Sequence, residues 1–255
     1  MRYSVALSGN QITTDDSRGS LSQRAYRHIR EQIFRGRIPL GAALPRRKLA
    51  KELGISPLPV AEALQRLESD GLVESLPRVG TRVKVPRPLD IRGHYVVREA
   101  LETQAARLFA AKASKEERGE LKRMAAELDA IYAKRPDPEV AAADLENHWF
   151  DVHTFHMQLH MRIAECTGFP ALCEAMEKNQ VLTFNWLYDE ASERHDLPHG
   201  WHSQLAEVLC EQDEEAASEA MRRHVRYGMD EVLKRLQRYA APGSAYVTQW
   251  NGFSR

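Results

Sequence analysis

Histidine carries most of the chemistry in this 255-residue chain, and eight of its ten copies lie between residues 148 and 224. His156 and His160 are four residues apart, so a helix places them on one face, about one turn apart. Two imidazoles in that position can reach one metal ion, and a polar cluster without metal is the alternative. Surface positions are expected for His148, His153, His195 and His199.

Asp151 is an alternative carboxylate ligand near this pair. It lies five residues before His156 and nine before His160. On a helix it is therefore roughly 140° and 180° around from them, and we expect it to face elsewhere. The three cysteines have no thiol pair at zinc-finger spacing, so we expect Cys166 and Cys173 to be buried apolar residues.

A net charge of zero hides an asymmetry along the chain. Residues 20–90 hold 14 Lys and Arg against 7 Asp and Glu, a balance of +7. Residues 91–255 hold 20 against 27, a balance of −7. A basic block of this kind could meet a polyanion, although many solvated domains reach the same charge.

Residues 20–85 show the element order of a winged helix-turn-helix. Apolar residues recur every fourth position from Leu21 to Ile33, which predicts a helix that ends at Gly36. Two shorter helices follow, the second opened by Ser56 as N-cap with Pro57 after it. The expected elements are helices beginning at 21, 46 and 57 and a hairpin over 72–85.

The remainder of the chain reads as an all-helical bundle, so the predicted fold class is mainly α. Two prolines in residues 86–90 predict a stiff linker, followed by a helical domain over 91–240. Residues 1–19 and 241–255 are expected to be loose tails. The expected helices cover 95–113, 115–134, 141–167, 170–191, 201–211 and 213–239.

Composition narrows the class of protein further. The chain is 43% hydrophobic and 28% charged, and no apolar run approaches the ~18 residues of a membrane helix. The first residues lack a signal-peptide pattern, and three cysteines suit a reducing compartment. We therefore expect a cytoplasmic protein without membrane contact.

Residues 21–85 resemble the GntR family of bacterial transcription regulators. The matching segments are 44–56, 59–64, 67–73 and 80–81. The resemblance implies that Arg47, Ser56 and Gly80 contact double-stranded DNA, with Arg46, Lys48 and Arg78 as nearby phosphate partners. Two arginines usual in the family are replaced by Pro57 and Ala61, so two direct readers of guanine are missing. The alternative is a winged helix used for protein contacts.

The helical part resembles the FCD effector domain of the fatty-acid-regulator branch of that family. The matches are residues 98–102, 159–160 with 168–170, and 221–224. The resemblance implies metal ligands at His160, His202 and His224. His156 stands where the family has a carboxylate, and four neutral ligands favour Zn²⁺ or Ni²⁺, or Cu²⁺, over harder ions. Arg98 either captures an effector carboxylate or pairs with Glu102.

Together these observations predict a homodimeric, DNA-binding regulator that is not an enzyme. A small organic acid bound over a divalent transition metal would change its affinity for a palindromic operator. Two alternatives remain. One is a metal-dependent enzyme, which is disfavoured because the sequence has no His-Glu-x-x-His run and no nucleophile motif. The other is a regulator whose metal is purely structural.

Overall fold

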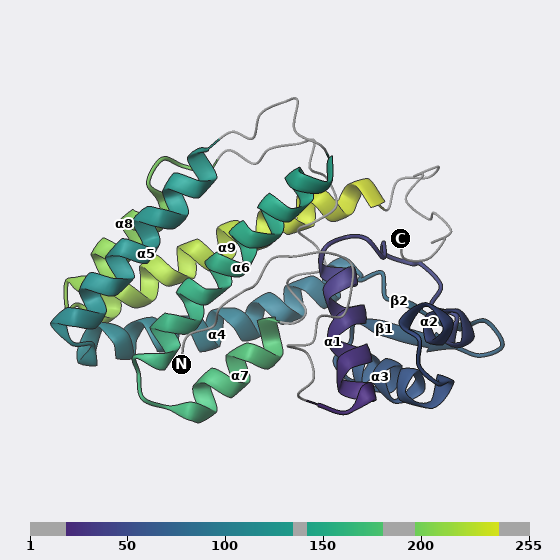
Figure 1. Cartoon of the computed structure of the whole chain (residues 1–255). Coiled ribbons are helices and arrows are strands. Elements are labelled where there is room, and N and C mark those ends of the chain that lie inside the picture. The colour runs from purple at the N-terminus through teal and green to yellow at the C-terminus, as the bar shows by residue number, and fades with distance from the viewer. Residues whose placement is uncertain (1–18, 135–141, 181–196, 240–255) are drawn as a thin grey trace.

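The computed structural model describes residues 19–134, 142–180 and 197–239, and Figure 1 shows a smaller and a larger group of elements. The expected tails lie outside this part of the chain, apart from Gly19. The first group contains α1 (Leu21–Phe34), α2 (Arg46–Leu53), α3 (Pro57–Ser69), β1 (Val73–Leu76) and β2 (Gly80–Val83). The second contains α4 (Pro88–Lys112), α5 (Lys115–Ala133), α6 (Ala142–Glu165), α7 (Pro170–Gln180), α8 (Trp201–Cys210) and α9 (Glu214–Tyr239).

Local sequence signals set the helix ends of the first group. The Ser20 hydroxyl accepts a hydrogen bond from the Gln23 backbone N–H, and the Gln23 side chain accepts one from the Ser20 N–H. Gly54 adopts the left-handed conformation that ends α2, and Pro57 occupies the first position of α3. The three predicted helices are confirmed.

The hairpin packs onto these helices as a wing. β1 and β2 are antiparallel, with Val73 opposite Val83 and Leu76 opposite Gly80. Both valines point into a core formed by the three helices, and that core includes Ile29, Leu49, Leu67 and Leu72. The predicted winged helix-turn-helix is therefore present.

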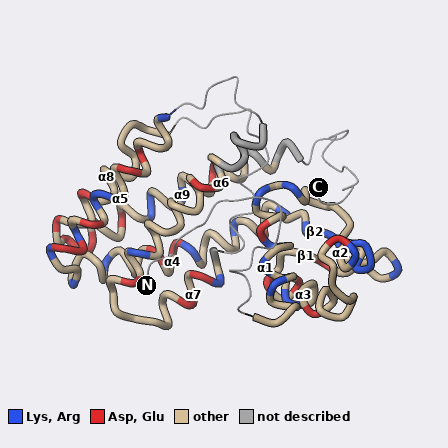
Figure 2. Tube along the Cα trace, in the orientation of Figure 1, with Lys and Arg blue, Asp and Glu red and all other residues tan. Residues whose placement is uncertain are grey.

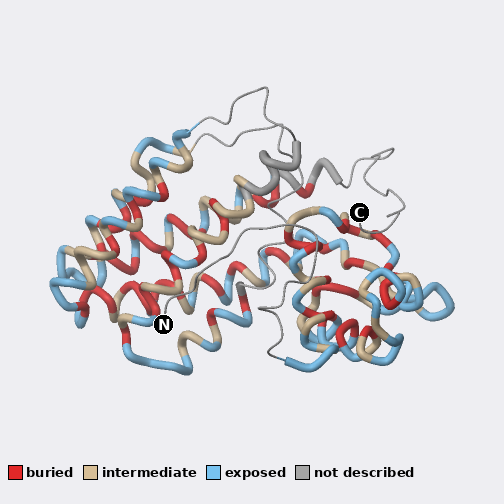
Figure 3. The backbone as a smooth tube through the Cα atoms, viewed as in Figure 1, coloured by how far each residue is buried: buried red, intermediate tan, exposed pale blue. Residues whose placement is uncertain are grey.

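The second group is a bundle with its own core. α4 and α9 pack along each other, and α5 lies between α6 and α8 (Figure 1). Ser114 and Glu117 form the predicted capping box that opens α5, and Asp213 caps α9 by accepting from two backbone N–H groups. Figure 3 shows buried residues along the inner side of each helix, as the sequence periodicity predicts.

The prediction of a linker over 86–90 is wrong for residues 88–90, which are helical. α4 begins at Pro88, with Arg87 as its N-cap. Asp90 accepts hydrogen bonds from the backbone N–H and the guanidinium of Arg87. A proline at the first helical position costs no hydrogen bond, because that N–H has no partner within the helix. Only residues 84–87 therefore separate β2 of the wing from the first helix of the bundle.

Phe150 of α6 also connects the two groups, because it packs against the core of the first. Arg35 directly follows α1, and its guanidinium lies over the ring of Phe150, 3.9 Å from the ring centroid. Among the described residues, we find no helix long and apolar enough to cross a membrane.

Candidate metal centre

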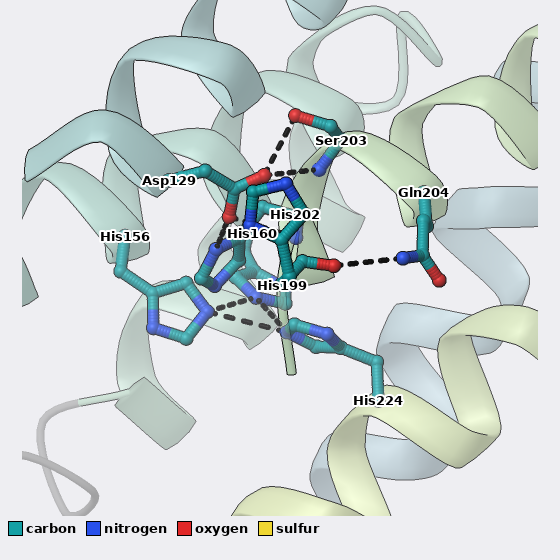
Figure 4. A network of polar contacts seen from close by, with 8 residues as sticks. All are labelled: Asp129, His156, His160, His199, His202, Ser203, Gln204 and His224. Carbon is teal, nitrogen blue, oxygen red and sulfur yellow. Dashed lines mark hydrogen bonds and ion pairs between the residues drawn. The ribbon is translucent and has the colours of Figure 1, made fainter. Parts of the chain in front are cut away.

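Four histidines from three helices converge on one point of the bundle (Figure 4). His156 and His160 come from α6, His202 from the first turn of α8, and His224 from the middle of α9. The Nε2 atoms of His156 and His160 are 2.9 Å apart, and each is 3.2 Å from Nε2 of His224. The ligand atoms of His156, His202 and His224 lie within 4.8 Å of one another.

The spacing of these nitrogens fits a shared metal ion. Two imidazoles that bind one ion at about 2.1 Å lie about 3.0 Å apart at a right angle and about 3.4 Å apart at a tetrahedral angle. Nε2 of His202 is buried without a hydrogen-bond partner, which is costly for a polar atom unless an ion or another group satisfies it. The donor set of four imidazoles suits Zn²⁺, Ni²⁺ or Cu²⁺.

A buried carboxylate orients His160 from outside the cluster. Glu102 Oε2 lies 2.7 Å from Nδ1 of His160, and Glu102 Oε1 is 2.5 Å from Nε of Arg98. Burial alone would raise the pKa of Glu102, but Arg98 and His160 outweigh it and lower that pKa to about 2. An ionised Glu102 favours a proton on Nδ1 of His160, which leaves Nε2 as the electron-pair donor.

A second carboxylate does the same for His202. Asp129 of α5 lies 2.7 Å from Nδ1 of His202 and accepts hydrogen bonds from the backbone N–H of His202 and of Ser203. The Ser203 hydroxyl donates to it as well, at 2.6 Å. These hydrogen bonds outweigh the effect of burial and lower the pKa of Asp129. One side chain therefore both caps α8 and orients a candidate ligand.

Ring packing limits the rotation of two of the imidazoles. His202 stacks on Tyr132, with ring centroids 5.4 Å apart, and His224 stacks on Trp201 at 5.5 Å. Burial lowers the pKa of His156, His202 and His224, and neighbouring histidines add to the effect. Neutral imidazoles are the form that binds metal.

The expected surface positions of the other histidines between 148 and 199 are met only in part. His148 is half-buried and His199 is exposed, while His195 lies outside the described residues. The expectation of a surface position is wrong for His153, which is 9% exposed. Its position seven residues before His160 puts it on the same face of α6, which packs against α4, α5 and α7.

Asp151 influences the imidazole of His148. Its charge raises the pKa of His148, although burial of that imidazole lowers it more strongly. The three cysteines are free thiols, half-buried, and they pack against the core of the bundle.

Arg98 pairs with Glu102, which was one of its two expected roles. Only 6% of Arg98 is exposed, and the pair links it through Glu102 to His160. Glu102 was visible in the sequence only as the neighbour of Arg98. Asp129 and Ser203 carried no sequence signal, because 73 residues separate Asp129 from His202.

The candidate DNA-binding residues gather at the far end of the first group. Arg46 and Arg47 are exposed in the first turn of α2, and Lys48 is half-buried beside them. Figure 2 shows Lys and Arg concentrated on α2 and at the tip of the wing. Cations at a helix N-terminus oppose the helix dipole, and a bound phosphate would relieve that repulsion.

Ser56, Arg78 and Gly80 are exposed on the neighbouring elements. Ser56 is the N-cap of α3, but its side chain makes no capping hydrogen bond. Arg78 has a φ of 65° at the turn of the wing, and Gly80 has a φ of 105° with no atom within 4 Å of an added Cβ. Such a backbone favours glycine, and it leaves the wing tip open to a close approach.

Comparison with known proteins agrees with this architecture. The model of bacterial regulatory proteins of the gntR family matches residues 21–83, and the model of the FCD domain matches residues 94–227. A "Probable D-xylose utilization operon transcriptional repressor" of Paenarthrobacter nicotinovorans is 38% identical over 94 residues, 37% of this chain and 42% of that one. Two further curated relatives are also matched over only about half of their own length, 56% of one and 55% of the other.

Other relatives match along most of the chain. An uncharacterised HTH-type transcriptional regulator of Streptomyces ambofaciens is 26% identical over 212 residues, 81% of this chain and 83% of its own. The structure of Escherichia coli McbR/YncC has a TM-score of 0.62 at 21% identity, covering 88% of this chain and all of that one. A GntR regulator structure from Rhodococcus sp. RHA1 has a TM-score of 0.65 at 23% identity, covering 85% and 99%. At these identities the structures show a shared fold.

Proposed function

The chain belongs to the gntR family of bacterial regulatory proteins and carries an FCD domain, and we propose that it senses a small organic acid through a metal ion. Residues 20–85 would bind DNA, and the helical domain over 91–240 would bind metal and effector. The observation that carries the proposal is the convergence of four imidazoles, two of which are oriented by carboxylates, the buried Glu102 and the half-buried Asp129. Zinc or nickel is the proposed metal.

The metal would attract an anionic effector. Four neutral imidazoles leave the charge of a divalent ion on the ion itself, and Glu102 is already paired with Arg98. His156 is half-buried while the other three histidines are buried, so the cluster is most accessible on the side of His156. A carboxylate that approaches there would bind the ion, and Arg98 would contribute a positive field through its place behind Glu102 and His160.

DNA binding would use Arg46, Arg47, Lys48, Ser56, Arg78 and Gly80. A single winged helix reads few base pairs, so we propose a two-fold homodimer on an imperfect palindrome. Val96 and Val97 of α4 support a subunit interface, because they are 69% and 48% exposed. Sedimentation that shows only monomer at micromolar concentration, with and without DNA, would contradict the dimer.

The test uses the full chain with the intergenic DNA beside its own gene. We expect salt-resistant, sequence-specific binding that changes at least fivefold when an acid from a panel of mono-, di- and tricarboxylates binds the metal-loaded protein. Metal removal by a chelator should abolish that change. Equal affinity for all DNA would contradict specific regulation, and an acid response that survives metal removal would contradict the role of the metal.

A further inference from the structure

The exposed side of α3 is apolar where the helix begins. Leu58, its second residue, is 68% exposed. Val60, Leu64 and Leu67 face the core of the first group, so the helical period places Leu58 on the opposite face and the half-buried Ala61 at the edge of that face. Leu58 is therefore not part of the core of the first group.

The surroundings of Leu58 favour DNA as the group that covers it. α3 is the second helix of the helix-turn-helix, the one that enters the major groove in such motifs. The preceding helix begins with the exposed cations Arg46 and Arg47, and the exposed Arg78 lies in the wing. A partner that pairs with these cations and also covers Leu58 would combine anionic groups with an apolar one, as DNA does with its phosphates and the groove between them.

The side chains of the first two turns of α3 restrict which bases they can read. Guanine presents only acceptors in the major groove, so its reader must donate. Leu58, Ala61 and Glu62 have no donor in their side chains. The first exposed donor beyond them is the amide of Gln65, and the first cation of α3 is Arg66. Its guanidinium lies 4.1 Å from the ring centroid of Tyr26, against α1.

We propose that Leu58 and Ala61 read thymine through its C5-methyl group. Thymine is the natural base with an apolar group in the major groove, and small apolar side chains contact that methyl. Part of the DNA specificity of this regulator would then come from thymine methyl groups that Leu58 and Ala61 bury, and not from hydrogen bonds to guanine. This inference rests on the proposed DNA-binding function.

The experiment replaces individual thymines by deoxyuridine, which lacks only the methyl group. Binding sites are first enriched from random duplex DNA with the full chain, and fluorescence anisotropy then compares thymine and uracil at each position. We expect one or two positions in each half-site where uracil weakens binding about fourfold, the effect of one buried carbon. Leu58→Ala should remove most of that difference at the position that Leu58 contacts.

Leu21→Ala is the matched control, because Leu21 is an exposed leucine of the same group at the start of α1. It should keep the full thymine preference. Specific binding in which every uracil substitution changes affinity less than twofold would overturn the inference and leave DNA binding intact. A thymine preference that Leu58→Ala leaves unchanged would also overturn it. Failure to enrich any sequence would contradict specific DNA binding itself, and the inference with it.

Discussion

The guanidinium of Arg35 lies over the ring of Phe150, 3.9 Å from its centroid, and this pair joins the two halves of the molecule. Arg35 follows α1 of the winged helix, and Phe150 belongs to α6, which also carries His156 and His160. Phe150 packs against the core of the winged helix as well. One rigid helix therefore connects the histidine cluster to the DNA-binding unit.

Replacing Phe150 tests whether α6 transmits the effector signal. Phe150→Ala should keep metal content and DNA affinity but reduce the effect of the organic acid on DNA binding by at least half. The reason is that the variant removes the contact of α6 with the winged helix and leaves the four histidines in place. Anisotropy titrations with and without the acid measure the ratio.

Phe169→Ala is the control for that variant. Phe169 is a second phenylalanine beneath a cation, with Lys112 Nζ 4.3 Å from its ring centroid, but it precedes α7 and is 46% exposed. Its loss should leave the response unchanged. An equal response in Phe150→Ala and the unmodified chain would show that the signal does not pass through this contact.

Arg47→Ala should weaken DNA binding and nothing else. Loss of one arginine contact to a phosphate or base costs about 1–3 kcal/mol, and loss of a phosphate contact lowers the salt dependence by about one unit. Metal content should not change. Arg123→Ala, an exposed arginine of α5, serves as control, and an affinity within twofold of the original for Arg47→Ala would mean that α2 is not at the DNA.

Asp129→Asn tests the carboxylate behind His202. Asp129 accepts from His202 with Oδ1 and from Ser203 with Oδ2, whereas asparagine is uncharged and has a single acceptor oxygen for both residues. The hold on the His202 ring is therefore weakened, and zinc affinity should fall about 10–100-fold. Asp213→Asn is matched to it, because Asp213 also caps a helix but has no contact with the cluster among the described residues. Competition with a zinc indicator measures both, and equal zinc affinities would contradict a role for Asp129.

The fold was largely predictable from the sequence, because its signals are local. Ser114 with Glu117 and Gly54 each fix a helix end through hydrogen bonds within a few residues, and Pro57 does so through its fixed backbone angle. Pro86 and Pro88 together predict a linker, but a proline also suits the first turn of a helix, and Pro88 begins α4. Only the side chain of Asp90, bonded to Arg87, decides between the two readings.

The site was predictable only in part. The spacing of His156 and His160 shows that they share a face, and the family resemblance added His202 and His224. The carboxylates behind the rings follow from tertiary packing, since α5 must meet α8 before Asp129 can reach His202. Burial of His153 has the same origin, because enclosure of α6 by its neighbours cannot be read from polarity.

Metal binding at neutral pH should release few protons. Burial lowers the pKa of His156 and His224 well below the ordinary 6.5, so both rings are neutral at pH 7 and no proton must leave them. Calorimetric zinc titrations in two buffers of different ionisation enthalpy should therefore give nearly equal heats. Protons compete only as the pH falls to these lowered values, so zinc should be retained below pH 6.5. Release of two or more protons at pH 7 would contradict neutral rings at both His156 and His224.

His156→Asp tests the ligand that departs from the family resemblance. The variant lowers the charge of the site by one, so we expect the metal to remain with a preference shifted toward Mn²⁺. An anionic effector should bind more weakly, because the ion is partly neutralised before the acid arrives. Elemental analysis and calorimetry measure both effects. If metal content, metal preference and effector affinity are all unchanged, His156 is not a ligand.

X-ray absorption on the metal-loaded full chain tests the central claim most directly, because it counts the ligands of the bound ion. The account predicts scattering from four imidazoles together with at least one further oxygen ligand that is not from a histidine, and a change in that ligand when an effector acid is added. Four imidazoles in closed tetrahedral coordination, unaltered by every acid tested, would show a structural ion and contradict metal-dependent sensing.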